Sequence, residues 1–328
     1  MAAEIRGPHP GRRVPDFFIV GHARSGSSAL YQMLRSHSQV FMPERKEPRF
    51  FASDLPTRYK PGHPNKLGET YDDYLALFDG AKPEQRVGEA SPTYIWSQTA
   101  PELISIAQPS ARIIAILREP ASFVRSLHIK LVQRGVETEK SLRKALALEE
   151  SRRQGRELGG RVLARFPQAL IYTDRVRYAA QVRRLRELFS QERVLVLIYD
   201  DYKRDNEGTV RKVQRFLDVD DAVPIAFSEI NHTVRVRSER LHTLSRRVAS
   251  GQSPTARAAR AAARTLAPRG VIRESAVAIG DRLLFAPPRA PDEGVMLALR
   301  RRFKPEVVAL SEYLERDLVS LWGYEQLD

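Results

Sequence analysis

Residues 17–34, FFIVGHARSGSSALYQML, decide the fold. Their first five residues belong to an almost continuously apolar run, residues 16–21, which predicts a strand that is buried on both faces. A tight Gly/Ser turn follows, and a helical pattern begins at Ser27. The run from Gly21 to Ser28 has the Gly-x4-Gly-Lys-Ser/Thr spacing of a nucleotide P-loop, but Ser27 stands in the lysine position and the positive charge lies upstream, at Arg24. This strand–turn–helix order directs backbone N–H groups and the helix dipole to one point, which predicts an anion-binding loop.

The rest of the chain predicts an α/β fold. Four further apolar runs indicate strands, at residues 39–42, 86–89, 112–117 and 193–199. Helical patterns are found at residues 27–36, 101–107, 121–133, 141–157, 172–189, 209–217 and 305–321. In the last of these, Pro305 suits a first-turn position. Strands that alternate with helices favour a P-loop-like three-layer fold, with a central parallel sheet of about five strands flanked by helices.

The chain of 328 residues shows no internal repeat and no clear linker. We expect a flexible leader at residues 1–14 and a single domain at residues 15–328, with a basic helical excursion at about 238–292. The leader has no apolar signal-peptide core, and no run is long and apolar enough to span a bilayer, so we expect a cytoplasmic protein. The absence of cysteine excludes disulfides, thiolate nucleophiles and cysteine metal sites.

The net charge of +14 favours an anionic partner. The excess is local, because ten arginines but one acidic residue, Glu239, lie between His232 and Arg273. Such a segment suits peripheral contact with an anionic surface. It lacks aromatic residues for stacking on bases, so we expect no nucleic-acid partner. The seven histidines show no H-E-x-x-H or comparable spacing, and we expect no metal requirement.

Residues 112–126, RIIAILREPASFVRS, contain a second candidate for anion binding. Arg118 follows a predicted parallel strand, at the edge where ligands of open α/β sheets bind. Its guanidinium can bind a phosphate with two hydrogen bonds at once. Taken alone, Arg118 would more readily be interpreted as a structural residue paired with Glu119.

Together, the two elements resemble those of PAPS-dependent sulfotransferases, most of all the heparan sulfate and tyrosylprotein types. The first is similar to their 5′-phosphosulfate loop, (K/R)-x-G-(T/S)-(T/S/R), and the second to their R-(D/E)-P…S element, which binds the 3′-phosphate. The resemblance implies transfer of the sulfuryl group from 3′-phosphoadenylyl sulfate (PAPS) to a hydroxyl or amine. It implies donor-binding roles for Arg24, Ser25, Gly26, Ser27, Ser28, Arg118 and Ser126, and weaker matches add Tyr178, Arg235 and Arg237.

Residues 44–51, ERKEPRFF, resemble the E-x-H-F-F element of heparan sulfate sulfotransferases, whose Glu is the general base. The match implies that Glu47 is the base and that Arg49 replaces the usual His. Glu44 is the alternative if the register follows the tyrosylprotein branch. Arg24 would stabilise the negative charge that develops on the leaving phosphate. It would act through its charge alone, because an arginine does not readily give up its proton.

Residues 88–94, GEASPTY, resemble the E-(K)-(T/S)-P-x-Y element that helps line the acceptor cleft of the family. This implies substrate contacts for Glu89 and Tyr94, and His22, inside the phosphate loop, is a further candidate. Ala90 stands where some members have lysine, which argues against a heparan-type acceptor. We expect a glycan, a lipid or a small metabolite as the acceptor.

Two other functions stay open. A P-loop kinase would use Asp200 and Asp201, at the end of the 193–199 run, as Walker B acids, although the missing lysine argues against this. A non-enzymatic binder of anionic surfaces would use the arginine-rich segment at 235–273. The sequence does not indicate the oligomeric state.

Overall fold

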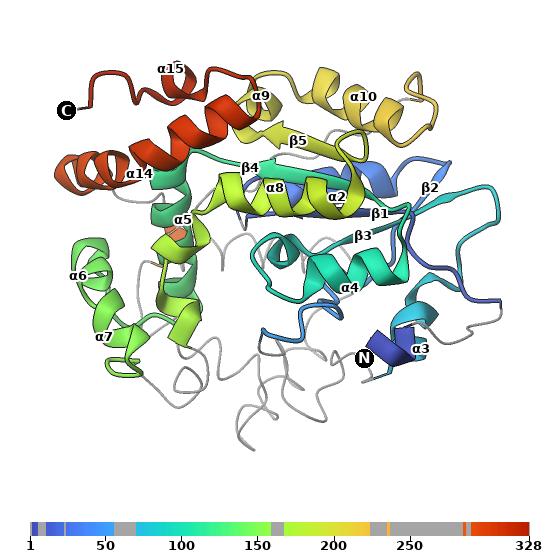
Figure 1. Cartoon of the computed structure of the whole chain (residues 1–328), viewed down its shortest axis with the longest axis horizontal. Helices are drawn as coiled ribbons and strands as arrows, with labels where there is room; N and C mark the ends of the chain where they lie inside the picture. Colours follow the sequence, from blue (N-terminus) through green and yellow to red (C-terminus); the bar gives the residue numbers. More distant parts are fainter. Residues whose placement is uncertain are drawn as a thin grey trace, which may run out of the picture.

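The computed structural model describes residues 2–5, 11–22, 24–55, 70–158, 167–223, 235–236, 285–286 and 290–327. Its centre is a five-stranded parallel sheet with the order β2-β3-β1-β4-β5 (Figure 1). The strands are β1 (Phe17–Gly21), β2 (Val40–Phe41), β3 (Arg86–Ala90), β4 (Arg112–Leu117) and β5 (Val194–Ile198). The predicted α/β class with about five parallel strands is confirmed.

The central strand, β1, is buried along its whole length, as its apolar sequence predicts. It pairs with β4, and Gly21 lies opposite Ile116. A Cβ atom on Gly21 would lie 2.4 Å from the Ile116 carbonyl oxygen. Glycine is therefore required where β1 turns into the phosphate loop, since the two backbones approach too closely for a side chain.

Helices cover both faces of the sheet (Figure 1). Alternate residues of β1 divide between the faces, with Phe18 and Val20 in one apolar cluster and Phe17 and Ile19 in the other. The first face packs mainly against α4 (Ala100–Ala107), α5 (Pro120–Gln133), α8 (Tyr178–Phe189) and α14 (Glu293–Tyr313). The second packs against α2 (Ser27–Arg35), α9 (Tyr199–Arg204) and α10 (Asn206–Phe216). The protein thus has the three layers that the alternating pattern predicts.

Smaller elements complete the described part. They are α1 (Ala2–Ile5), α3 (Tyr71–Leu75), α6 (Leu142–Ala147), α7 (Glu149–Arg153), α15 (Leu318–Trp322), β6 (Arg235–Val236), β7 (Phe285–Ala286) and four short 3-10 turns. The turns are η1 (Ala76–Phe78), η2 (Pro92–Ile95), η3 (Pro167–Leu170) and η4 (Thr173–Arg175). No helix among the described residues is both long and apolar enough to cross a membrane.

Two helix predictions are wrong at their N-terminal ends. Pro305 does not start a helix but lies inside α14, which begins at Glu293 behind an Asp292 cap. The exposed position of Pro305 lets water satisfy the carbonyl that its missing N–H leaves unpaired. The helix expected from residue 172 begins only at Tyr178, because the Tyr172 N–H bonds to a side chain elsewhere, the Glu149 carboxylate, at 2.7 Å.

The expected domain boundaries stay predictions. Within the expected leader, residues 2–5 form α1, Ile5 is buried, and the Glu4 carboxylate accepts a hydrogen bond from the Tyr71 N–H at 2.6 Å. Most of the basic excursion at 238–292, and of the arginine-rich segment at 235–273, lies outside the described residues.

Candidate active site

The phosphate loop connects β1 to α2, as expected. Gly26 is the N-cap of α2 and has a left-handed φ of 93°. A Cβ atom there would lie 2.7 Å from the Tyr202 ring, so only glycine fits. Because glycine has no side chain to cap the helix, the first N–H groups of α2 stay available to an anion.

The loop also holds a strained arginine and a buried hydroxyl. Arg24 has a left-handed φ of 73°, which costs roughly 1–2 kcal/mol for a residue with a Cβ atom. The Ser25 hydroxyl is buried, and its oxygen has no hydrogen-bond partner among the described residues. Strain and an unsatisfied buried polar group in one loop are typical of a ligand-binding loop.

The two elements expected to bind anions touch each other. Arg118, directly after β4, donates a hydrogen bond from Nη1 to the carbonyl oxygen of Arg24 at 2.8 Å. The Arg24 Nε in turn donates to the Ser126 Oγ at 3.4 Å. Burial, and then the nearby charge of Arg118, lower the pKa of Arg24. Two cations forced together in this way favour an anion between them.

The structural alternative for Arg118 is wrong. Glu119 does not pair with it but caps α5, accepting hydrogen bonds from the N–H groups of Ala121 at 3.0 Å and Ser122 at 2.6 Å. Its carboxylate also accepts the Tyr324 hydroxyl. The Arg118 guanidinium instead lies over the Tyr199 ring, 4.7 Å from its centroid.

Tyr178, the first residue of α8, lies against His22 of the phosphate loop. Both are buried, and their rings stack with centroids 4.6 Å apart. The Tyr178 hydroxyl has no hydrogen-bond partner among the described residues. The His22 Nε2 lies 3.2 Å from the Gln181 Oε1, and burial lowers the pKa of His22 to about 3, so its ring is neutral. Their expected contacts with donor or substrate stay predictions.

The remaining expected donor residues are incompletely described. Arg235 belongs to β6, which contacts α5, the helix that carries Ser126. The Arg235 side chain and all of Arg237 lie outside the described residues.

Glu47 lies at the same edge of the sheet as the phosphate loop. Its N–H bonds to the Ala90 carbonyl at the end of β3, at 3.1 Å. Its carboxylate pairs with Arg49 at 2.8 Å and lies 3.7 Å from the Lys46 Nζ. Lys46 also donates a hydrogen bond to the Ser28 Oγ at 2.6 Å, so one lysine links Glu47 to the phosphate loop.

The alternative base, Glu44, points into solvent. Its side chain is 93% exposed and pairs at 3.5 Å with Arg35, whereas the Glu47 side chain is 16% exposed. The geometry therefore favours Glu47. Both Glu47 and Arg49 have left-handed φ angles, of 56° and 59°, which turn this segment back toward β3.

Glu89 and Tyr94 lie below the Glu47 segment and not at the surface. Glu89 is fully buried, and its Oε2 accepts hydrogen bonds from the hydroxyls of Tyr94 at 2.9 Å and Tyr74 at 3.0 Å. Burial raises the pKa of Glu89 to about 7. The Tyr94 hydroxyl accepts the Phe51 N–H at 3.4 Å, which ties this network to the base segment. Direct contact of either residue with the acceptor stays a prediction.

Two cations near Glu47 escaped the sequence analysis. Lys130 follows Ser126 by four residues on α5, and its pKa falls to about 7, first through burial and then through the nearby cations Arg134, Arg24 and Arg49, whereas Glu47 opposes the shift. Arg175, in η4, lies over the Trp96 ring at 4.2 Å, and its pKa falls to about 10 through burial and then through Arg49. The i, i+4 spacing from Ser126 is a signal that would have pointed to Lys130.

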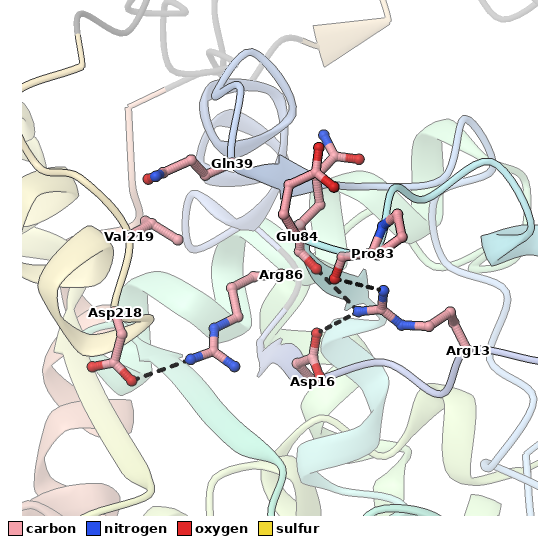
Figure 2. A pocket seen from close by; sticks show the side chains of 9 residues that line it. Arg13, Asp16, Gln39, Pro83, Glu84, Arg86, Asp218 and Val219 are labelled. Carbon is pink, nitrogen blue, oxygen red and sulfur yellow. Dashed lines mark hydrogen bonds and ion pairs between the residues drawn. The ribbon is translucent and has the colours of Figure 1, made fainter.

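A polar hollow lies at the opposite, amino edge of the sheet (Figure 2). Four of its charged side chains form two pairs, with Arg86 3.3 Å from Asp218 and Arg13 3.4 Å from Asp16. The Asp16 carboxylate also accepts the Val87 N–H at 2.8 Å. These pairs support the ends of β1 and β3, far along the sheet from the phosphate loop.

Other expected or alternative features are structural. The Walker B candidates lie on α9, where Asp200 accepts the Trp322 Nε1–H at 3.0 Å and Asp201 pairs with Arg204 at 2.7 Å. Across the described residues, no three His, Asp or Glu side chains are grouped so that they could hold a metal ion.

Fold and site define a P-loop-like α/β protein in which the two elements expected to bind anions meet, with the partly buried Glu47 carboxylate at the same edge of the sheet. A model of the sulfotransferase family matches residues 15–222. The chain belongs to the sulfotransferase family, as its motifs predicted, and this decides against the kinase alternative.

Individual relatives agree with this assignment. The chain is 25% identical to carbohydrate sulfotransferase 15 of Mus musculus over 271 residues, covering 66% of this chain and 46% of the relative. It is 31% identical to heparan sulfate glucosamine 3-O-sulfotransferase 6 of Mus musculus over 118 residues, covering 34% of this chain and 30% of the relative. The chain thus spans less than half the length of these two relatives.

A solved structure matches nearly the whole chain. The crystal structure of a sulfotransferase from Alicyclobacillus acidocaldarius superposes with a TM-score of 0.64 and 28% identity. The match covers 95% of this chain and 99% of that one.

Proposed function

We propose that this protein transfers the sulfuryl group of PAPS to a hydroxyl or amine of an acceptor by in-line displacement. The observation that carries the proposal is the hydrogen bond from Arg118 to the Arg24 carbonyl, at 2.8 Å. It joins the element expected to bind the 3′-phosphate to the loop expected to bind the 5′-phosphosulfate. One ligand with anionic groups at both positions would neutralise both arginines.

The donor would be held by backbone and side chains together. The free N–H groups at the start of α2, the Ser25 hydroxyl and Arg24 suit the 5′-phosphosulfate. Arg118 and Ser126 suit the 3′-phosphate, with a charge-assisted bond from the guanidinium.

Glu47 would act as the base. The acceptor oxygen or nitrogen attacks sulfur, the bond from sulfur to the 5′-phosphate oxygen breaks, and the acceptor proton passes to the Glu47 carboxylate. Arg24 stabilises the charge that develops on the leaving phosphate. The link from Ser28 through Lys46 holds Glu47 beside the loop, which favours the close approach that direct transfer requires.

The acceptor would be a glycan, a lipid or a small metabolite. The names of the relatives, a carbohydrate sulfotransferase and a heparan sulfate glucosamine sulfotransferase, support a carbohydrate among these.

Binding of the spent donor, 3′-phosphoadenosine 5′-phosphate (PAP), tests the donor assignment. At 100 times its Kd, PAP should add about 2.7 kcal/mol to the free energy of unfolding, whereas ATP with magnesium should add little. Arg118→Ala should weaken PAP at least about tenfold, since a charged hydrogen bond contributes roughly 1.5–3 kcal/mol. Arg211→Ala, an exposed change on α10, is the matched control. Stabilisation by ATP with magnesium alone would contradict the proposal.

A further inference from the structure

The last strand of the sheet, β5, has a neighbouring strand on one side only among the described residues. It ends the strand order β2-β3-β1-β4-β5 and pairs with β4 (Figure 1). With five residues, it is longer than the two-residue strand β2 at the opposite edge. An edge strand of this length presents backbone N–H and C=O groups on which another chain can add a strand.

The pairing of β5 with β4 shows which of its backbone groups face outward. The Arg193 carbonyl accepts the Ile113 N–H at 2.7 Å, so the Arg193 carbonyl faces β4. Along a strand, the N–H and C=O of one residue point to the same side, and this side alternates from residue to residue. The Val196 N–H and carbonyl therefore point away from β4, as does the Ile198 N–H. No backbone group among the described residues bonds to these three groups.

A hollow of about 630 Å³ lies at this outer edge. Residues 196–198 of β5 form one part of its lining, and the rest comes from α9, α10 and Arg316, which follows α14. The open strand thus lies in a recess. A segment that bound there would contact charged side chains as well as the strand.

Positive side chains outnumber carboxylates in this hollow. The cations are Arg204, Lys212, Arg215 and Arg316, and the carboxylates are Asp201 and Asp205. Both carboxylates are engaged, Asp201 with two of these arginines and Asp205 with the first turn of α10. Arg215 pairs with Asp221 at 3.3 Å, whereas the exposed Lys212 has no ion-pair partner among the described residues. The hollow is therefore suited to a partner that carries negative charge.

We propose that β5 binds an extended, acidic segment of a partner protein, which adds to the sheet as a sixth strand. The backbone of the segment bonds to the outward groups of Val196 and Ile198, and Lys212 pairs with one of its carboxylates. Main-chain bonds of this kind supply affinity, and the charged walls of the hollow supply selectivity. The inference does not depend on the proposed sulfuryl transfer.

The charges around β5 favour this occupant over others. Positive side chains beside an edge strand disfavour pairing with an apolar strand. A second copy of this chain would bring the same excess of cations to the interface, and like charges that face each other across a strand pair are destabilising. An acidic segment gains favourable contacts instead, and the net charge of +14 attracts it from a distance.

Strand-forming peptides test this docking strand. The probe is fluorescein-labelled Glu-Val-Glu-Val-Glu-Val-Glu, mixed with increasing amounts of the full chain and followed by fluorescence anisotropy. One control peptide has lysine in place of every glutamate. The other has proline at the central valine, which keeps the charge but removes an N–H from the strand. We expect the acidic peptide to bind at least about tenfold more tightly than either control and to slow amide hydrogen exchange at Val196 and Ile198.

Variants locate the binding at β5. Val196→Pro removes an outward N–H without removing a bond to β4, so it should abolish peptide binding while urea denaturation shows a folded protein. Lys212→Met, an exposed change, should weaken the acidic peptide severalfold, and this variant carries the test if Val196→Pro does not fold. Lys203→Met, which removes an exposed charge of α9 outside the hollow, should leave the affinity unchanged.

Three results would overturn the proposal. Equal affinity for the acidic peptide and its proline control would show attraction by charge alone. Binding of none of the peptides would show that the edge does not accept a strand. Dimerisation of the chain that Val196→Pro abolishes would place a second copy at this edge in place of an acidic partner.

Discussion

Arg118 donates a hydrogen bond to the backbone carbonyl of Arg24, 2.8 Å away, although 94 residues separate them along the chain. The contact exists because β1 and β4 are neighbours in the sheet and end side by side, with Gly21 opposite Ile116. Each strand delivers one arginine to its carboxyl end. The site is therefore a consequence of strand order, and its integrity should depend on the loop backbone as much as on the charged groups.

Gly26→Ala should disrupt the phosphate loop. The new methyl group would meet the Tyr202 ring at 2.7 Å, and alanine disfavours a φ of 93°. We expect a loss of about 1–3 kcal/mol in the free energy of unfolding, measured by urea denaturation, together with a loss of PAP binding. Gly155→Ala is the matched control, since Gly155 has a φ of 77° but nothing within 4 Å of a Cβ atom. PAP affinity that survives Gly26→Ala would contradict the assigned loop.

The choice of base predicts unequal effects of two similar substitutions. Glu47→Gln keeps the shape of the side chain but removes the proton acceptor, so kcat should fall by about 10²–10⁴ with PAP affinity retained. Glu44→Gln, at the 93% exposed side chain, should leave kcat near the wild-type value. Steady-state assays of PAP formation make the comparison. The opposite ranking would assign the base to Glu44.

Glu89 predicts a pH dependence of stability. Its pKa is about 7 in the folded protein and about 4.3 in an unfolded chain, so the folded state binds more protons between these values. The contribution of Glu89 to the free energy of unfolding is complete below about pH 4.3 and falls as the pH rises toward 7, by roughly 3 kcal/mol. Urea denaturation at several pH values should show this loss in the wild type and not in Glu89→Gln. Parallel pH profiles for the two proteins would rule it out.

The buried ion pair of Glu137 and Arg152 should be a major determinant of stability. Two bonds of 2.8 and 2.9 Å join the side chains, which are 0% and 1% exposed, and the Tyr172 hydroxyl also donates to Glu137 at 2.6 Å. Removing one partner leaves a buried charge unpaired, so Arg152→Met should lower the free energy of unfolding by about 3–5 kcal/mol.

A double variant measures how much of this loss of stability comes from the pairing of Glu137 with Arg152. Arg152→Met combined with Glu137→Gln should be less destabilised than the sum of the two single variants, because neither charge is then left alone. Additive losses in urea denaturation would show that the two side chains act independently.

Local sequence patterns predict well where the strands and the expected donor-binding loops lie. They predict poorly which side chains from distant parts of the chain come close together. Apolar runs located all five strands within two residues. The near-continuous runs at β1 and β4 reflect the burial of these strands on both faces. Arg49 acts on the pKa values of Lys130 and Arg175, two cations from distant parts of the chain, and no local pattern contains this relationship. The helix start predicted from Pro305 was wrong. Proline prefers the first turn of a helix, but it can also occupy an exposed position inside a longer helix, as it does in α14.

The direction of the Glu89 side chain also could not be predicted from its motif. The GEASPTY motif indicates a position beside the acceptor cleft, and β3 does end next to Glu47. Alternation along β3 nevertheless turns the Glu89 side chain into the aromatic cluster with Tyr74 and Tyr94. The motif predicts where this segment of the chain lies. The face of the sheet to which Glu89 points depends on its position in the alternation along the strand.

The most direct test of sulfuryl transfer follows the label of [³⁵S]PAPS into acceptors. Wild-type protein, supplied with a panel of glycans, glycolipids and hydroxylated metabolites, should form a labelled product and an equal amount of PAP. Glu47→Gln should bind PAP but form neither at a comparable rate. Label that stays in PAPS across the whole panel, with PAP bound normally, would contradict the assignment of this site to sulfuryl transfer.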